Sequence, residues 1–493
     1  MGAFQNYPYA DVHQLNLDWI IKKIKEVRDK EDELDQAVLD AKNYAESANE
    51  SAVNAENYFN LIQNAIKTPE MFGAVGDGVA DDTQALQSCL TDNSFIYLKN
   101  EYRITSPLIF DNLKNVIMFG GKISRPTDAT FNTVYGDNCE NIYIHNVMFE
   151  GNGNNRNMTY TWKDNIQGCI ILASKSKNIF IEKCKIKNFN YGVFILGADD
   201  ENEPVSFENT SANGVIRNCL FYNINSPIDT YGKDLEISNN MIYDTTGNAI
   251  QIEPVNTPDM NDDPLQDIYY DTSGLSCSVH DNLIINVVGV GINIHPNSSA
   301  ISIKNNAIIN FGNGINADTR YSRGIIISDN FLYNQNAVAI DNNTRPWGVK
   351  YGAAIKCGST ATVSNNIIKA AIVGLNITGG ALVCNNVIDH PRISGIVTYY
   401  ATSATGSIGI YTGNKIIFTR DANGWWGCRA FNFGSNPDMS TIILMNDNVV
   451  ESDVQPLKVE ASLGIEVKIT NLITSVAVTD TIATITTKNI YSN

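Results

Sequence analysis

Four titratable residues in the middle of the chain recur at matching positions of short alternating segments. Glu253, His295, Asp318 and Asp341 follow an earlier asparagine at offsets of 13, 13, 12 and 11 residues. If each segment is one rung of a stack of strands, the four side chains point to the same side, with rungs about 4.8 Å apart. Carboxylates and an imidazole at such spacing can act as general acid and base on a glycosidic bond. The plain alternative is that these are solvated surface positions.

Two cleavage chemistries are open for this column. Glu253 and Asp318 would stand two rungs apart, about 9–10 Å, near the wide carboxyl separation of an inverting hydrolase. Asp318 and Asp341 would stand about 5 Å apart, where like charges raise one pKa and create an acid, while His295 orients or protonates. A lyase would instead need a basic group and commonly Ca²⁺, which Asp318 with Asp341 would hold. Outside that case the sequence predicts no metal and no other cofactor.

Loop lengths indicate how substrate would reach the column. Between Glu253 and Val279 lie 25 residues, and between Asp341 and Val363 lie 21. By contrast, only 7 residues separate His295 from the next predicted strand, and only 8 separate Asp318 from the strand after it. Two short rungs between two long insertions predict a groove. Aromatic, amide and guanidinium side chains beside it are candidate sugar contacts; they are Tyr231, Gln251, Asn293, Asn316, Arg345 and Trp347.

The column depends on a repeat of eight short copies between residues 181 and 388, each with a β-branched residue, two variable residues, Asn or Cys, one variable residue and an apolar residue. Spacings of 20 to 42 residues between copies are typical of coils that carry insertions. We therefore predict a single-stranded right-handed parallel β-helix over 69–454, in which the amides stack inside the coil. The fourth positions are Cys184, Cys219, Asn240, Asn282, Asn306, Asn330, Asn366 and Asn386.

The segment before the repeats predicts oligomerisation. Residues 1–19 form a polar and aromatic leader, and over 20–68 apolar residues alternate at steps of three and four from Ile20 to Ile66, interrupted only at Glu31. That seam predicts a coiled-coil helix. The alternative is a helix that folds back onto its own β-helix.

Two smaller segments flank the coils. In 71–90, Gly73, Gly76 and Gly78 predict tight turns, and Asp82 or Thr83 would cap a short helix over the open end of the first coil, with cation binding as a lesser alternative. Residues 455–493 alternate with period two and predict a small antiparallel β module.

Composition excludes several classes of partner. A net charge of −18 and a pI near 4.7 argue against nucleic acid and anionic membranes. No apolar run approaches the ~20 residues of a membrane span, and no basic-then-apolar leader indicates a signal peptide. Nine cysteines without a C-x-x-C pair predict reduced, structural thiols.

The segment FGAVGDGVADDTQALQ, followed by the asparagine coils, resembles the pectate-lyase superfamily, in particular its branch in bacteriophage tailspikes and appendages. The stretch NYPYADVHQLNLDWIIKKIKEV is similar to the N-termini of phage tail proteins. This resemblance implies a homotrimeric virion protein, made in the host cytoplasm, that docks to other tail or neck proteins through its N-terminus. It also implies binding, and often cleavage, of host-surface polysaccharide. A non-catalytic adhesin or structural spike, or a free polysaccharide-degrading enzyme, are the alternatives.

The superfamily's polygalacturonase motifs are incomplete in this chain. NADTR (316–320) echoes the first motif, and neither G-H-G nor R-I-K occurs. No catalytic residue is therefore transferred from the resemblance.

Overall fold

The computed structural model divides the chain into two compact units, Met1–Ile66 and Lys67–Asn493. It describes residues 42, 66–92, 95–153, 167–172, 175–195, 212–253, 276–295, 298–317, 324–334, 352–358, 361–378, 380–391, 394–399, 408–418, 429–433, 441–452, 457–459, 465–474, 485–487 and 490–492. Of the first unit only Lys42, which is helical, and Ile66 belong to this set, so the leader and most of the predicted seam lie outside it.

One end of the predicted helix is wrong. Ile66, the last position of the seam, lies in strand β1 (Ile66–Lys67) rather than in a helix. Thr68 is extended, with φ −118° and ψ 148°, and precedes Pro69. Proline disfavours helical conformation in the residue before it, which a heptad count does not register.

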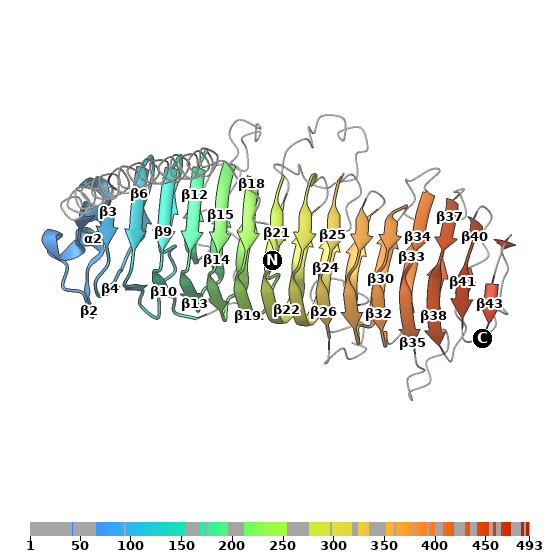
Figure 1. Ribbon diagram of the computed structural model, residues 1–493. Helices are drawn as coiled ribbons and strands as arrows, with labels where there is room; N and C mark the ends of the chain where they lie inside the picture. The colour runs from blue at the N-terminus through green and yellow to red at the C-terminus, as the bar shows by residue number, and fades with distance from the viewer. Residues whose placement is uncertain are drawn as a thin grey trace, which may run out of the picture. The chain divides into compact units, whose positions relative to one another are not determined.

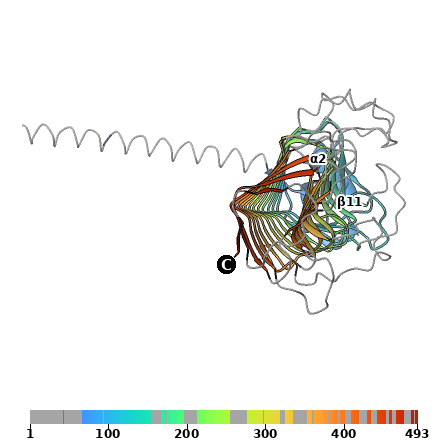
Figure 2. The same ribbon diagram turned by 90° about the vertical axis from the view of Figure 1, so that its right-hand side faces the viewer.

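The second unit is a parallel β-helix whose coils each place one strand on three successive faces (Figures 1 and 2). All of its described strand pairs are parallel, which confirms this part of the predicted fold. The first face contains β3 (Phe95–Tyr97), β6 (Lys114–Phe119), β9 (Glu140–His145), β12 (Lys177–Glu182), β15 (Ala212–Arg217), β18 (Lys233–Ser238), β21 (Ser278–His280), β23 (Ser302–Lys304), β25 (Ile326–Ser328), β28 (Thr362–Ser364), β31 (Leu382–Cys384), β34 (Ile408–Thr412), β37 (Thr441–Asn446), β40 (Ile465–Ile469) and β42 (Ile485–Thr487).

The second face follows the first in every coil. It contains β2 (Asp77–Asp81), β4 (Glu101–Arg103), β7 (Lys122–Ser124), β10 (Met148–Glu150), β13 (Lys185–Lys187), β16 (Leu220–Tyr222), β19 (Met241–Thr245), the first halves of β22 (Leu283–Ile294) and β24 (Ala307–Ala317), β26 (Phe331–Tyr333), β29 (Ile367–Lys369), β32 (Val387–Asp389), β35 (Lys415–Phe418), β38 (Asn448–Ser452), β41 (Leu472–Thr474) and β43 (Ile490–Ser492).

The third face completes the coil. It contains β5 (Leu108–Ile109), β8 (Val134–Gly136), β11 (Gly168–Leu172), β14 (Tyr191–Ile195), β17 (Ser226–Thr230), β20 (Ile250–Ile252), the second halves of β22 and β24, β27 (Ala353–Cys357), β30 (Val373–Thr378), β33 (Ser394–Tyr399), β36 (Arg429–Phe433) and β39 (Leu457–Val459). Because β22 and β24 run from the second face into the third, these two faces form one continuous sheet.

Columns of aliphatic side chains fill the coil. On the first face, Ile237, Val279, Ile303, Ile327 and Val363 occupy consecutive rungs and are fully buried. β-Branched side chains suit a pleated surface, and each covers the one on the rung before it. Apolar burial of this kind is the main stabilising contribution to each coil.

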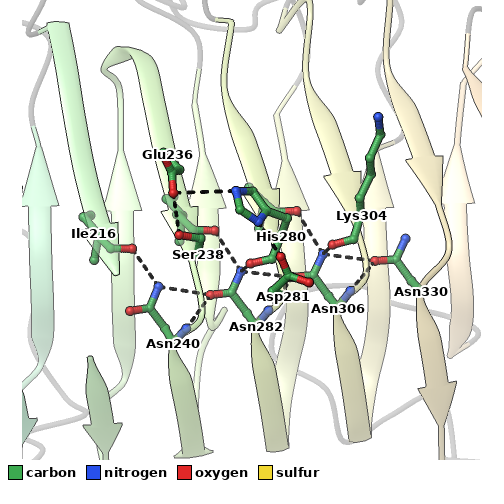
Figure 3. Close-up of polar contacts among 12 residues, drawn as sticks. Ile216, Glu236, Ser238, Asn240, His280, Asp281, Asn282, Lys304, Asn306 and Asn330 are labelled. Atoms are coloured by element: carbon green, nitrogen blue, oxygen red, sulfur yellow. Dashed lines mark hydrogen bonds and ion pairs between the residues drawn. The ribbon is translucent and has the colours of Figure 1, made fainter. Parts of the chain in front are cut away.

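The predicted asparagine ladder is present at the turn from the first to the second face (Figure 3). The Asn282 Nδ2 donates to Asn306 Oδ1 at 3.0 Å and to the carbonyl of Ile237 at 2.9 Å. The backbone N–H of Asn282 donates to the same Oδ1 at 3.1 Å. The ladder begins at Asn240 and continues beyond the predicted repeats to Asn414 and Asn448. Buried amides are thereby satisfied by their neighbours on adjacent rungs.

The residue before each ladder position is left-handed. Asn239, Asp281, Asn305 and Asp329 have φ between 54° and 59°. Asparagine and aspartate tolerate this conformation better than other side-chain-bearing residues, so the recurring Asn-Asn and Asp-Asn pairs encode the turn itself.

A short helix covers the first coil, as predicted. Leu86 and Leu90 of α2 (Thr83–Asp92) are buried in the core, and the 3-10 helix η1 (Pro69–Phe72) precedes it. Gly73, Gly76 and Gly78 all have positive φ, which confirms the predicted turns.

The predicted side-chain cap of α2 is only partly right. The Asp82 carbonyl accepts the first helical hydrogen bond from Leu86, but its carboxylate binds the N–H groups of Val75 and Gly76 instead of the helix. Asp81 accepts from the N–H of Thr83 at 3.1 Å. The backbone N–H groups of the Gly-rich loop need acceptors, and the Asp82 carboxylate supplies two of them.

The predicted C-terminal antiparallel module is wrong. β40 pairs in parallel with β37 and β42, and β41 pairs in parallel with β38 and β43. Alternation with period two reports one buried strand face and does not distinguish parallel from antiparallel neighbours.

Eight of the nine cysteines are described, and none of these eight forms a disulfide bond. Seven of them are buried, including Cys184 and Cys219 at ladder positions. No helix in the described part of the chain is long and apolar enough to cross a membrane.

Candidate active site on the third face

One outward column of the third face collects polar side chains from six consecutive rungs. The pairing of β17, β20, β22, β24, β27 and β30 sets this register. Ile250, Ile252 and Ile292 point inward and are fully buried, so the predicted alternation is confirmed on these rungs. In order along the axis, the column contains Asp229, Gln251, Asn293, Asn316, Lys356 and Asn376.

A second set of side chains lies two residues after the first column, directly beyond the ends of β17, β20 and β22. The N–H of Glu253 donates to Thr230 O at 2.8 Å, and that of His295 donates to Ile252 O at 2.9 Å, so Tyr231, Glu253 and His295 follow one another rung by rung. Glu253 Oε1 and His295 Nε2 are 3.6 Å apart. The predicted stacking of these three residues is confirmed, and their chemical roles stay predictions.

A chain of hydrogen bonds fixes the Glu253 carboxylate. Gln251 Nε2 donates to Glu253 Oε1, and Asn248 Nδ2 donates to Gln251 Oε1 at 2.5 Å. The Asn248 Oδ1 in turn accepts from the backbone N–H of Val290 at 3.1 Å. Only 14% of the Glu253 side chain is exposed, against 30% for His295. The carboxylate is therefore held in one orientation, with its imidazole partner closer to solvent.

Asp229 is the residue that the sequence interpretation missed. It points outward from β17, yet it is 5% exposed. Burial, and then the charge of Glu253, raise the pKa of the Asp229 carboxyl well above its usual range. Burial, the charges of Glu253 and Asp229, and a hydrogen bond with Glu253 likewise raise the pKa of Tyr231. Asp229 follows Cys219 by 10 residues, as Asn316 follows Asn306, so the offset rule would have found it.

The predicted position of Asp341 is wrong. The rung beyond Asn316 is β27, which places Lys356 next to Asn316, and the N–H of Gly358 donates to Ala317 O. Gly358 thus occupies the place predicted for Asp341. The sequence Val-Ala-Ile-Asp (338–341) alternates as a strand would, and so does Ala-Ala-Ile-Lys-Cys (353–357). Alternation alone could not select between them because the length of the insertion was unknown.

The remaining predicted contacts fall outside the described residues. Asp318 follows directly after the end of β24, and Asp341, Arg345 and Trp347 lie in 335–351. Of the two predicted long insertions, 254–275 and 342–351 are also outside, whereas Ala353–Cys357 of the second forms β27, so the predicted groove stays a prediction. Among the described residues, no three His, Cys, Asp or Glu side chains could together hold a metal ion.

The column contains acceptors suited to hydroxyl groups. Asn316 Nδ2 donates to Asn293 Oδ1 at 2.7 Å, which leaves the Asn316 Oδ1 pointing onward. Within the described part of this column, the Oδ1 atoms of the amides Asn316 and Asn376 are buried without a hydrogen-bond partner. Buried acceptors are rarely left unpaired, so a ligand that brings donors would complete them.

No protein-family model and no curated protein matches the sequence. Among solved structures, the chain is similar to the A-module of the mannuronan C-5 epimerase AlgE6 of Azotobacter vinelandii, at 15% identity and a TM-score of 0.49, over 81% of this chain and 97% of that one. It is also similar to an exopolygalacturonase of Thermotoga maritima, at 14% identity and a TM-score of 0.44, over 85% and 96% of the two chains. The surface adhesin PfbA of Streptococcus pneumoniae matches at 12% identity and a TM-score of 0.40, over 78% and 92%. Because these identities and TM-scores are low, the functional conclusion rests on the geometry of the site in this chain.

Proposed function

We propose that the third face binds a polysaccharide and that Glu253 and His295 cleave it by acid–base chemistry. The observation that supports this most strongly is the carboxylate–imidazole pair, 3.6 Å apart, on a column of amides with unpaired acceptors. Rungs about 4.8 Å apart are close to the length of one sugar unit, so an extended glycan running along the axis would meet the same kind of contact at each rung.

Each residue of the pair has a distinct task in this proposal. Glu253, held by Gln251 and Tyr231, is the base that accepts a proton from water or from the sugar carbon next to a carboxylate. His295, the more exposed partner, delivers a proton to the departing glycosidic oxygen. In hydrolysis the anomeric C1–O bond breaks, and water gives its hydroxyl to C1 and a proton to the departing oxygen. In elimination the C4–O bond on the other side of the glycosidic oxygen breaks, C5 loses its proton to Glu253, and a C4=C5 double bond forms.

Asp229 supports the base without touching substrate. Burial, and then the charge of Glu253, raise the pKa of the Asp229 carboxyl, which favours its uncharged form beside Glu253. We call it a positioning residue because its side chain is buried beside the pair.

We further propose that this activity serves attachment of a bacteriophage tailspike or appendage to its host. The support is the sequence resemblance of 71–87 and of the N-terminal segment to phage appendage proteins. A non-catalytic adhesin is the second candidate, favoured by the amides Asn293, Asn316 and Asn376, which can bind sugar but cannot transfer protons.

A panel of bacterial surface polysaccharides incubated with the full chain tests the proposal. We expect one class of glycan to give new reducing ends, and absorbance at 235 nm from unsaturated uronates would identify elimination. Tight binding without any product would support the adhesin instead. Neither binding nor product across the panel would overturn both.

A further inference from the structure

The second face has a long apolar zone on its outer surface. Two outward columns run along this face, and their middle rungs have no charged side chain. The zone occupies seven rungs in one column and five in the other; its members are Leu220, Met241, Leu283, Ala307, Phe331, Ile367 and Val387, with Tyr222, Tyr243, Ile285, Ile309 and Tyr333.

Ion pairs border the zone at both ends of the same columns. Before it, Lys122 contacts Glu101 and Glu150 at 2.8 and 2.7 Å. Beyond it, Lys415 contacts Glu451 at 2.7 Å. The outer surface of the second face is therefore charged towards its two ends and apolar in its middle.

The same coils are more polar on the first face. There one outward column contains Val215, Glu236, Ser278, Ser302, Ile326, Thr362 and Leu382, of which three are apolar. The other contains Arg217, Ser238, His280, Lys304, Ser328, Ser364 and Cys384, none of them a large apolar side chain. A parallel sheet whose outer surface contacts water does not require apolar side chains there. The second face therefore differs from the first face of the same coils in the polarity of its outer surface.

The apolar zone is accessible and continuous. Met241 and Ile367 are 41% and 43% exposed, and the Tyr222 and Tyr243 rings stack at 4.5 Å. Six rung steps of about 4.8 Å by a width of about 10 Å give roughly 300 Å² of flat apolar surface. That is somewhat less than half of the ~800 Å² per partner of a standard interface.

We propose that this apolar zone is the contact surface for a second copy of this chain. If the copies are related by a rotation axis parallel to the β-helix, identical coils lie at the same height in each copy. The apolar zone of one copy can then contact the apolar zone of the next. The heptad pattern from Ile20 to Ile62, which leaves out Ile66 of β1, predicts association with identical helices and would supply the remaining area. The inference is independent of the proposed glycan chemistry on the third face.

The test compares matched double variants of the full chain by sedimentation and light scattering. Ile285→Lys with Ile309→Lys places two charges in the zone, and Ser278→Lys with Ser302→Lys places them on the first face of the same coils. We expect wild type and the serine variant to be oligomeric, with association at least 10-fold weaker in the isoleucine variant. A monomeric wild type, or equal association of all three proteins, would overturn the proposal.

Cross-linking keeps the test decisive if the lysine variant fails to fold. Ala307→Cys lies in the zone, and Ser302→Cys lies on the first face five residues earlier. A short bis-maleimide should join subunits through Ala307→Cys and leave Ser302→Cys at the level of wild type. Equal cross-linking of the two variants would contradict the proposed contact.

Discussion

Two glutamate–histidine pairs lie on different faces of neighbouring coils. On the first face, Glu236 Oε1 and His280 Nε2 are 3.7 Å apart, and on the third face Glu253 Oε1 and His295 Nε2 are 3.6 Å apart. The pairs share residue types and distance, yet their surroundings differ (Figure 3 shows the first). Their difference indicates what turns a surface ion pair into a candidate active site.

The first-face pair is an exposed polar network. His280 Nδ1 also contacts Asp281 at 2.7 Å, Ser238 donates to Glu236, and 40% of the Glu236 side chain is exposed. The third-face pair has 14% exposure at its glutamate, a fixed hydrogen-bond chain and a buried acid beside it. Water screens the first pair, whereas low dielectric strengthens interactions of the second.

Exchanging each glutamate for glutamine should separate the pairs most strongly. Glu253→Gln removes the proposed base and should lower the cleavage rate about 10³-fold, because glutamine accepts no proton at neutral pH. Glu236→Gln should leave the rate within about twofold, since surface ion pairs contribute little. Product release from the cleaved glycan measures both. Equal losses in the two variants would show that the third-face pair has no special role.

Removing one ladder amide should affect stability more than activity. Asn306→Ala leaves the buried donors of Asn282 without their acceptor and should lower the free energy of unfolding by roughly 2–3 kcal/mol. Lys304, two residues earlier, is exposed on the first face, so Lys304→Ala is the matched control with an effect below about 0.5 kcal/mol. Denaturant unfolding measures both. Indistinguishable midpoints would contradict the ladder's structural importance.

Asp229→Asn should give the smallest and most pH-dependent change. Because burial and Glu253 raise its pKa, the native state holds this proton more tightly than the unfolded chain, whose pKa is about 3.9. Stability is then full below that pH and falls as pH rises toward the folded pKa. The variant lacks this decline and should be more stable than wild type by about 1–3 kcal/mol at pH 8, with little difference at pH 4.

Asp234→Asn, at an exposed position of the first face, is the control for this titration. It should follow wild type at both values of pH. If Asp229→Asn also follows wild type, the buried carboxyl is ionised like any other, and its proposed role beside Glu253 falls.

The fold could be predicted from the sequence because its determinants are local and repeated. The side chains of Asn282 and Asn306 bond to each other, to their own rung and to the rungs beside it, so spacing along the chain reports stacking directly. The site was partly predictable for the same reason: Glu253 and His295 are reached by counting from the ladder. Counting failed beyond Asn316, where an insertion of unknown length delays the next strand to Ala353. Asp229 was missed because its importance comes from burial, which alternation does not report.

The structure of the Glu253→Gln variant with an oligosaccharide of the cleaved or bound glycan tests the central claim most directly. We predict that the sugar chain lies along the axis on the third face, with hydroxyl groups donating to Asn316 Oδ1 and the scissile bond beside His295. A sugar chain bound on the first or second face, with the third-face column unoccupied, would contradict the proposed active site.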